Sequence, residues 1–339
     1  MSRKRLMIVV LAVCALCLIA TGSAFAQSKV TWKAQVLTPL KSYMGSSYWG
    51  VWAKLVNERT KGAMEIKLFE PGAIAAGNQI YAAVQNGAID AGCSYGAYHT
   101  TEIPVAYSEY SLPAAFKDFN DLHKFYYDYK GGEAIKLLDQ EYQKKGTKFL
   151  SLAAFTVGFM TKFEIKNIED VKGKKLRASG PYIGLLKGLG AAPSLIASPE
   201  QYMALQLGTI DGTLNPLYMA ETYKLKEVIK YIVLPPVGYG TGETYVNMNS
   251  WKKLPDDFKK IVQQSAVDAA YSYKEDYAKA EEADIKKAEA VGVKVVHLSD
   301  KTMAAFEAAS IPIWDEAAKK SASSKKFIDL LKDYKKTAK

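Results

Sequence analysis

Residues 168–180 read Ile168-Glu169-Asp170-Val171-Lys172-Gly173-Lys174-Lys175-Leu176-Arg177-Ala178-Ser179-Gly180. Within this run, Leu176 to Ala178 is a short segment typical of a buried strand, and apolar residues at helical spacing follow from Tyr182 to Leu189. A second helical segment, Glu200 to Leu207, leads to another strand at Thr209 to Thr213. This alternation of strands and helices predicts an α/β fold with a parallel sheet covered by helices.

The first half of the chain repeats the same pattern. Periodicity predicts strands at Lys29–Val36, Met64–Phe69 and Ala88–Gly92, with helices at Trp49–Val56 and Asn78–Val84 between them. Further helices at Asp118–Tyr129 and Glu133–Lys144 lead to a strand at Lys148–Ala153. Two similar lobes in one chain predict a cleft between them.

The last third of the chain is mainly helical. No proline interrupts the helical pattern between Pro255 and Val291, so we expect one long helix that spans both lobes. A strand at Lys294–Leu298 and helices at 301–320 and 325–334 follow. We expect lobe I to comprise residues 27–151 and about 240–275, and lobe II residues 152–239 and about 276–339. The run Gly238-Tyr239-Gly240-Thr241-Gly242 lacks the spacing of a dinucleotide site and is expected to be a loop between the lobes.

The N-terminus has the pattern of an export signal. Arg3, Lys4 and Arg5 precede an apolar run from Leu6 to Ala20 and a group of small residues that ends at Ala26. This order predicts a signal peptide over residues 1–26, cleavage before Gln27 and a periplasmic mature protein. Cys93 is then the one cysteine left, so the core must stabilise the fold without an internal disulfide.

Several chemistries lack a sequence signal. The formal net charge is +10, but basic and acidic residues alternate along the helices, so we do not expect nucleic-acid binding. His99, His123 and His297 lie too far apart in sequence to form a metal motif, and no nucleophile elbow or phosphate-binding loop is present. We therefore expect no cofactor, no metal and no enzymatic activity.

Several motifs occur in one order along the mature chain. They are Glu70-Pro71-Gly72-Ala73, Asn86-Gly87-Ala88-Ile89-Asp90, Gly173-Lys174-Lys175-Leu176-Arg177, Leu189-Gly190-Ala191-Ala192-Pro193, the run from Pro199 to Gly212, and Asn249-Ser250-Trp251-Lys252-Lys253-Leu254-Pro255. In this order the chain resembles the solute receptors of tripartite ATP-independent periplasmic (TRAP) transporters, of the C4-dicarboxylate-receptor-like (DctP) family. The resemblance implies a two-lobed periplasmic binding protein fold with a long lobe-spanning helix. It also implies lobe closure on a small solute and delivery to the TRAP membrane permease subunits.

The resemblance also implies which residue anchors the ligand. Arg177 takes the place of the family's arginine that forms a bidentate pair with a carboxylate, and a guanidinium fork matches two carboxylate oxygens. Asn215 matches a position that donates to the same carboxylate, although an Asx turn before Pro216 is the alternative. Leu214 replaces a glutamate that in one branch of the family helps to bind a metal, so we expect no accompanying cation.

Other candidate contacts come from both lobes. Thr156 and Phe159 lie where other branches carry a glutamine or a second arginine, and Phe159 can instead belong to the core. Tyr95 and Tyr98 follow a predicted strand, at the end where ligands bind in open α/β sheets, although packing is the alternative for each. The remaining candidates, mostly by resemblance, are Tyr182, Tyr218, Glu243, Thr38 and Gln79.

Because a single arginine is placed for the ligand, we expect a small organic acid with one carboxylate, such as a 2-keto, 2-hydroxy or aromatic acid. Two alternatives stay open. One is a binding protein of an ATP-driven importer, and the other is a periplasmic enzyme that acts on a carboxylate.

Overall fold

A computed structural model describes residues 29–110 and 112–337 of the chain. The expected signal peptide, residues 1–26, and its cleavage point before Gln27 lie outside the described residues. None of the helices in the described part is both long enough and apolar enough to cross a membrane.

The described strands form one ten-stranded sheet. They are β1 (Val30–Val36), β2 (Met64–Phe69), β3 (Ala91–Ser94), β4 (Thr147–Thr161), β5 (Lys175–Arg177), β6 (Ala192–Ser194), β7 (Gly212–Asn215), β8 (Tyr231–Leu234), β9 (Gly238–Asn247) and β10 (Lys294–His297). Their order is β2-β1-β3-β9-β4-β7-β5-β6, with β8 pairing to both β4 and β10. The predicted α/β class is therefore confirmed.

The sheet is mixed, although the alternating pattern favoured a parallel one. β1 pairs in parallel with β2 and β3, and β5 pairs in parallel with β6 and β7. The two long strands β4 and β9 are antiparallel to each other, and β9 is antiparallel to β3 while β4 is antiparallel to β7 and β8. The parallel strands thus form three groups, β1 to β3 in the first lobe and β5 to β7 and the pair of β8 and β10 in the second, and β4 and β9 join the lobes.

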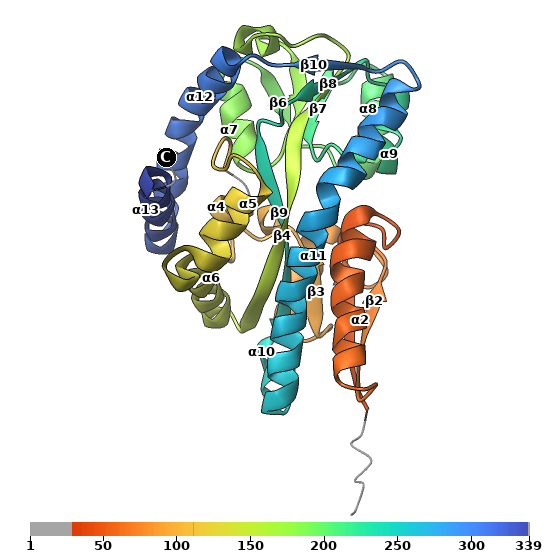
Figure 1. Cartoon of the computed structure of the whole chain (residues 1–339), viewed down its shortest axis with the longest axis vertical. Helices are drawn as coiled ribbons and strands as arrows, with labels where there is room; N and C mark the ends of the chain where they lie inside the picture. Colours follow the sequence, from red (N-terminus) through yellow and green to blue (C-terminus); the bar gives the residue numbers. More distant parts are fainter. Residues whose placement is uncertain (1–28, 111, 338–339) are drawn as a thin grey trace, which may run out of the picture.

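The helices cover both faces of this sheet (Figure 1). They are α2 (Gly50–Arg59), α3 (Ile80–Gln85), α4 (Ala106–Tyr110), α5 (Phe119–His123), α6 (Glu133–Lys144), α7 (Pro181–Gly188), α8 (Gln201–Gln206), α9 (Met219–Thr222), α10 (Met248–Lys252), α11 (Asp256–Glu289), α12 (Asp300–Ala318) and α13 (Ala322–Thr337). β2 and α6 begin and end where the sequence predicts. The other predicted boundaries differ by a few residues, with two exceptions: β4 runs on to Thr161, and the helix predicted at Asp118–Tyr129 is α5 followed by a π-helical turn, Lys124–Asp128.

α11 is the predicted long helix, with 34 residues. It packs against α2 of the first lobe, against β4 and against α9 of the second lobe. Figure 1 shows it running from α10 at the bottom of the molecule to β10 at the top. The two-lobed fold with a lobe-spanning helix is thus confirmed.

The glycine-rich run from Gly238 to Gly242 is not a loop, as its composition suggested, but the first half of β9. Its backbone pairs with β4 over the register Gly238–Val157 to Gly242–Ala153. Glycines are required because neighbouring side chains cross this strand closely. A β-carbon at Gly240 would overlap the Phe155 ring, and one at Gly238 would overlap the Tyr182 hydroxyl.

The last helix returns to the first lobe. α13 packs against α4 and α6, and Phe327 and Leu331 are buried in a core cluster with Leu138 of α6. In Figure 1, α12 descends from the upper lobe and α13 lies beside the lower one. The sequence division assigned all residues after about 276 to lobe II. We now propose that α13 belongs to lobe I, so that α12 is a further crossing between the lobes.

Candidate ligand-binding site

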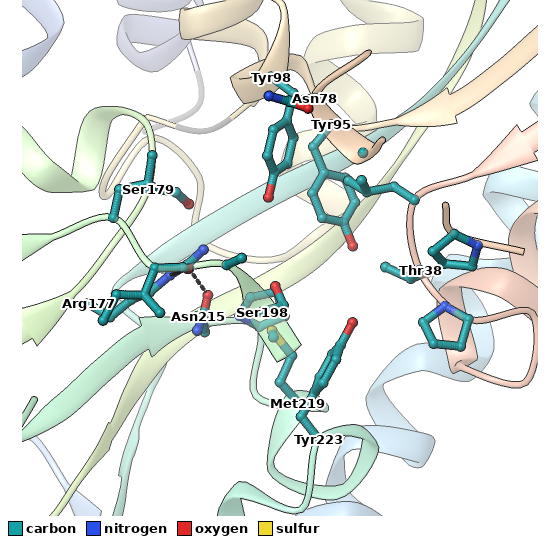
Figure 2. Close-up of a pocket in the computed structure, with 18 of the residues that line it drawn as sticks. Thr38, Asn78, Tyr95, Tyr98, Arg177, Ser179, Ser198, Asn215, Met219 and Tyr223 are labelled. Atoms are coloured by element: carbon teal, nitrogen blue, oxygen red, sulfur yellow. Dashed lines mark hydrogen bonds between the residues drawn. The ribbon is translucent and has the colours of Figure 1, made fainter. Parts of the chain in front are cut away.

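A cavity of about 590 Å³ lies between the two lobes (Figure 2). Its volume falls in the range of small-molecule sites, about 300–1,000 Å³. Residues of both lobes line it: Leu37, Thr38, Pro39, Pro71, Gly77, Asn78, Tyr95, Tyr98 and Tyr110 from the first, and Arg177, Ser179, Leu195, Ile196, Ala197, Ser198, Asn215, Pro216, Tyr218, Met219 and Tyr223 from the second.

The cavity lies at the carboxyl ends of parallel strands. Thr38 follows β1 and Tyr95 follows β3, while Arg177 is the last residue of β5 and Asn215 the last residue of β7. Parallel strands end at one edge of a sheet, and in open α/β folds ligands bind at that edge. The fold therefore brings together residues that are far apart in sequence.

Arg177 is buried, with 3 % of its surface exposed. Its Nε donates to the carbonyl of Ile196 at 3.0 Å and its Nη1 donates to Oδ1 of Asn215, which leaves three of the five guanidinium N–H groups for a ligand. Among the described residues no carboxylate forms an ion pair with it. Burial lowers the pKa of the guanidinium from its usual value. A buried cation without a counter-charge is costly, and a bound anion removes that cost.

A polar network fixes Asn215 behind the arginine. Its Nδ2 donates to Oε1 of Gln201 and to Oγ1 of Thr213, both at 2.5 Å, and Thr213 also donates to Gln201 at 2.9 Å. The amide oxygen of Asn215 therefore faces Arg177, and the NH2 group that was expected to reach a carboxylate is already engaged. In this arrangement Asn215 orients the guanidinium. The buried Gln201, which the sequence did not single out, holds the amide in place.

Tyrosines dominate the rest of the lining. Three of them form hydrogen bonds across the cleft: the hydroxyls of Tyr95 and Tyr218 lie 2.9 Å apart, and the hydroxyl of Tyr110 lies 3.2 Å from Oγ of Ser179. Tyr98 and Tyr223 are partly exposed toward the cavity, and neither hydroxyl forms a hydrogen bond with a described residue. The sequence singled out Tyr95, Tyr98 and Tyr218. Tyr110 and Tyr223 carry no local signal, because a helix and a loop bring them to the cavity.

Two of the predicted residues on β4 face away from the cavity. Thr156 hydrogen-bonds to the carboxyl of Glu281 and lies 3.2 Å from the hydroxyl of Tyr277, both on α11. Phe159 is fully buried against Phe306 of α12, with ring centroids 5.8 Å apart, which is the core position that the alternative predicted. The strand directs these side chains into the helices that cover it.

Tyr182 and Glu243 also lie outside the cavity lining. Tyr182 is 1 % exposed and packs under Gly238 of β9. Side chains along a strand alternate between the two faces of the sheet, and the side chain of Glu243 points into the first lobe, toward His99 and Tyr142. Gln79 is exposed at the surface, and its neighbour Asn78 lines the cavity instead.

Glu243 belongs to a buried polar cluster with His99 and Tyr142. The Tyr142 hydroxyl donates to Oε2 of Glu243 at 2.5 Å, and Nε2 of His99 lies 2.7 Å from both Oε1 of Glu243 and the Tyr142 hydroxyl. Burial raises the pKa of Glu243 to about 8 and lowers the pKa of His99 to about 3. At neutral pH the cluster therefore holds a neutral imidazole beside a largely protonated carboxyl.

The described residues contain no group of three or more histidine, cysteine, aspartate or glutamate side chains placed to hold a metal ion. The cavity lining offers one positively charged side chain, that of Arg177, together with amide and hydroxyl groups and aromatic rings. This arrangement can bind and orient an anion.

Comparison with known proteins gives a consistent result. Residues 36–321 match the family model described as bacterial extracellular solute-binding protein, family 7 (DctP). The chain is 28 % identical over 292 residues to a monocarboxylate 2-oxoacid-binding periplasmic protein of Nostoc sp., covering 84 % of this chain and 78 % of the relative. It is also 28 % identical over 278 residues to a C4-dicarboxylate-binding periplasmic protein of Rhodobacter capsulatus, covering 79 % and 80 %.

Solved structures share the fold. A TRAP periplasmic solute binding protein from Desulfovibrio salexigens, with bound orotic acid, superposes with a TM-score of 0.82 at 24 % identity, covering 90 % of this chain and 98 % of that protein. A second, from Rhodoferax ferrireducens with bound malonate, gives a TM-score of 0.81 at 21 % identity, covering 89 % and 97 %. The family match spans most of the chain, and the chain therefore belongs to the DctP family, family 7 of the bacterial extracellular solute-binding proteins.

Proposed function

We propose that this protein is a periplasmic TRAP receptor that captures a small organic monocarboxylate at Arg177 and delivers it to the membrane permease. The observation that carries the proposal is the buried guanidinium that lacks an acidic partner among the described residues and lines the cleft between the lobes. An organic carboxylate supplies the missing charge and matches the remaining donors in geometry.

The cavity lining favours one carboxylate. Arg177 is the one charged side chain among the lining residues, so a second carboxylate of the ligand would have no cation to pair with. The two named relatives differ on this point, because one is a monocarboxylate 2-oxoacid-binding protein and the other a C4-dicarboxylate-binding protein. The single arginine of this chain supports the first of these two ligand types.

Delivery to a permease requires that the receptor open and close. The strands β4 and β9 cross between the lobes, and α11 packs against both lobes. Hinge bending of these connections would open the cleft and break the Tyr95–Tyr218 and Tyr110–Ser179 contacts. A permease would then recognise the closed form.

Titration calorimetry with matched acids tests the binding part of the proposal. The pairs are butyrate with succinate and benzoate with terephthalate, so that each dicarboxylate adds one charge to a similar carbon frame. We expect binding of at least one monocarboxylate, weaker binding of its dicarboxylate partner, and a loss of about 100-fold or more in Arg177→Met, since truncating one partner of a buried charge pair costs about 2–5 kcal/mol.

Arg59→Met is the matched control, because Arg59 pairs with Asp268 at the surface of α2 and does not line the cavity. Equal affinity of the wild type and Arg177→Met for every acid that binds would refute the assignment of the anchor. Tighter binding of the dicarboxylates would refute the proposal that the ligand carries a single carboxylate.

A further inference from the structure

We infer that the captured acid is an aromatic monocarboxylate, whose carboxylate binds Arg177 and whose ring lies between two walls of the cavity. This inference rests on the proposed function and specifies its ligand. It follows from the position of the one charge, from the aromatic surface beside it and from the neutral far end of the cavity.

The first wall is a continuous aromatic surface on lobe I. The rings of Tyr98 and Tyr95 have centroids 6.4 Å apart and lie 31° from parallel, and those of Tyr95 and Tyr110 are 6.0 Å apart at 35°. In the closed cleft the hydroxyls of Tyr95 and Tyr110 are held by Tyr218 and Ser179 of the other lobe, so these two rings are fixed where they face the cavity. Fixed tyrosine rings offer contact area at little entropic cost.

The second wall comes from lobe II. Tyr223 and Met219 lie at opposite ends of α9 and both line the cavity. Figure 2 shows them below the cavity, opposite Tyr95 and Tyr98 above it, with Arg177 to one side and Thr38 to the other. A methionine sulfur and an aromatic ring both make favourable contacts with the face or edge of an aromatic ligand. The space between the walls therefore suits a flat ring attached to a carboxylate.

The far end of the cavity limits what the ring can carry. Thr38 lies there, and its Oγ1 accepts a hydrogen bond from Ser42 at 3.0 Å, which leaves its own hydroxyl proton available. The hydroxyls of Tyr98 and Tyr223 are also without partners among the described residues. These groups can bind a neutral hydroxyl or keto substituent, but they offer no positive charge to a second acid group.

Matched ring pairs test the inference. Benzoate, phenylacetate and 3-phenylpropanoate are compared by calorimetry with their cyclohexyl counterparts, which keep the charge and the number of ring carbons and lack the aromatic face. Because aromatic pairs are worth about 0.5–1.5 kcal/mol beyond burial, we expect at least one aromatic acid to bind about 2- to 12-fold more tightly than its saturated partner.

The preference should depend on the walls. Tyr98→Leu and Tyr223→Leu should each reduce this preference, while Tyr129→Leu, in the first lobe away from the cavity, should leave it unchanged. Melting temperatures measured without ligand identify any variant that fails to fold. If one of the two wall variants, Tyr98→Leu or Tyr223→Leu, does not fold, the other one tests whether the aromatic preference depends on the walls.

The same measurements distinguish failure of the aromatic ligand class from failure of the proposed function. Binding that depends on Arg177 but shows equal or tighter affinity for the saturated acids would overturn the aromatic class and leave the carboxylate receptor standing. If no carboxylate binds in an Arg177-dependent manner, the proposed function fails together with this inference.

Discussion

Two buried polar groups of this protein, Arg177 at the cleft and Glu243 within the first lobe, have opposite surroundings. Arg177 keeps free donors and has no acidic partner among the described residues. Glu243 accepts from Tyr142 and lies 2.7 Å from His99, and burial raises its pKa to about 8, so it loses its charge by taking up a proton. An arginine cannot lose its charge in this way.

The difference separates a ligand-binding charge from a structural polar group. A carboxyl that neutralises itself and hydrogen-bonds to its neighbours needs nothing from outside the protein. For Arg177, a permanent cation buried beside a cavity of about 590 Å³, we propose that an anion from solvent supplies the counter-charge. The following predictions test whether the two groups differ as described.

The largest expected effect concerns stability without ligand. Glu243→Ala removes the acceptor of Tyr142 and the neighbour of His99, and unsatisfied buried polar groups cost about 1–3 kcal/mol each, so we expect unfolding free energy to fall by about 2–5 kcal/mol. Arg177→Met breaks no ion pair, and the loss of its hydrogen bonds to Ile196 and Asn215 is offset by the removal of an unpaired buried charge, so it should change the unfolding free energy by about 1 kcal/mol or less. Denaturant titration measures both.

Glu243→Gln is the control for this pair, because an amide keeps a donor and an acceptor at the same position. It should recover most of the stability that Glu243→Ala loses. A loss in Arg177→Met as large as that in Glu243→Ala would show that the arginine, too, has a structural role, and the contrast would fail.

The second prediction gives Arg177 an internal counter-charge. Asn215→Asp places a carboxylate where the amide oxygen now accepts from Nη1 of Arg177. The new acid competes with the ligand, and hydrogen bonds to charged groups are worth about 1.5–3 kcal/mol, so we expect affinity to fall by about 10- to 100-fold. Asn249→Asp, on the surface at α10, adds the same charge and should bind as the wild type does. Unchanged affinity in Asn215→Asp would argue against a carboxylate at this end of the cavity.

The third and smallest effect is a difference in pH dependence. Burial raises the pKa of Glu243 to about 8 and of Glu281 to about 7, so above about pH 4.3 the folded state holds protons that the unfolded state has released, and stability falls as pH rises. Burial lowers the pKa of His99 and His123 to about 3, so stability also falls as pH drops below about 6.5. The two effects oppose each other below pH 6.5, and only the carboxyls act above it.

Unfolding free energy should therefore decline from pH 6.5 to 8, by at most about 1.4 kcal/mol per pH unit for each group. Glu243→Gln should flatten part of this decline, which denaturant titrations at each pH will detect. Ligand affinity should stay constant over the same range, because neither arginine nor a carboxylate titrates there. An affinity that changes with pH in the same way as the unfolding free energy would show that Arg177 and Glu243 are coupled, and the distinction between the two groups would fail.

Much of the fold follows from the sequence because its signals are local. Hydrophobic periodicity and strand-ending residues predicted α6 and β2 to the residue and the long helix α11 to within a few residues. β9 was missed because its glycines serve a packing role that only the folded chain shows: Phe155 lies across Gly240, and Tyr182 lies across Gly238. The place that we propose for α13, in lobe I, differs from the sequence division, because a helix pattern does not tell which lobe the helix will cover.

The site shows the same limit. Arg177, Asn215 and Tyr95 lie at the ends of strands, where the sequence could place them, and all three line the cavity. Glu243 and Thr156 lie on the long crossing strands, and which face of a strand points to the cleft depends on the register that tertiary packing sets. Whether any of the lining residues contacts a ligand stays a prediction.

A crystal structure of the protein with a bound monocarboxylate tests the central claim most directly. The account predicts both carboxylate oxygens within about 2.7–2.9 Å of guanidinium nitrogens of Arg177, with Glu243, His99 and Tyr142 unchanged inside the first lobe. A carboxylate bound elsewhere in the cavity, with Arg177 still unpaired, would contradict it.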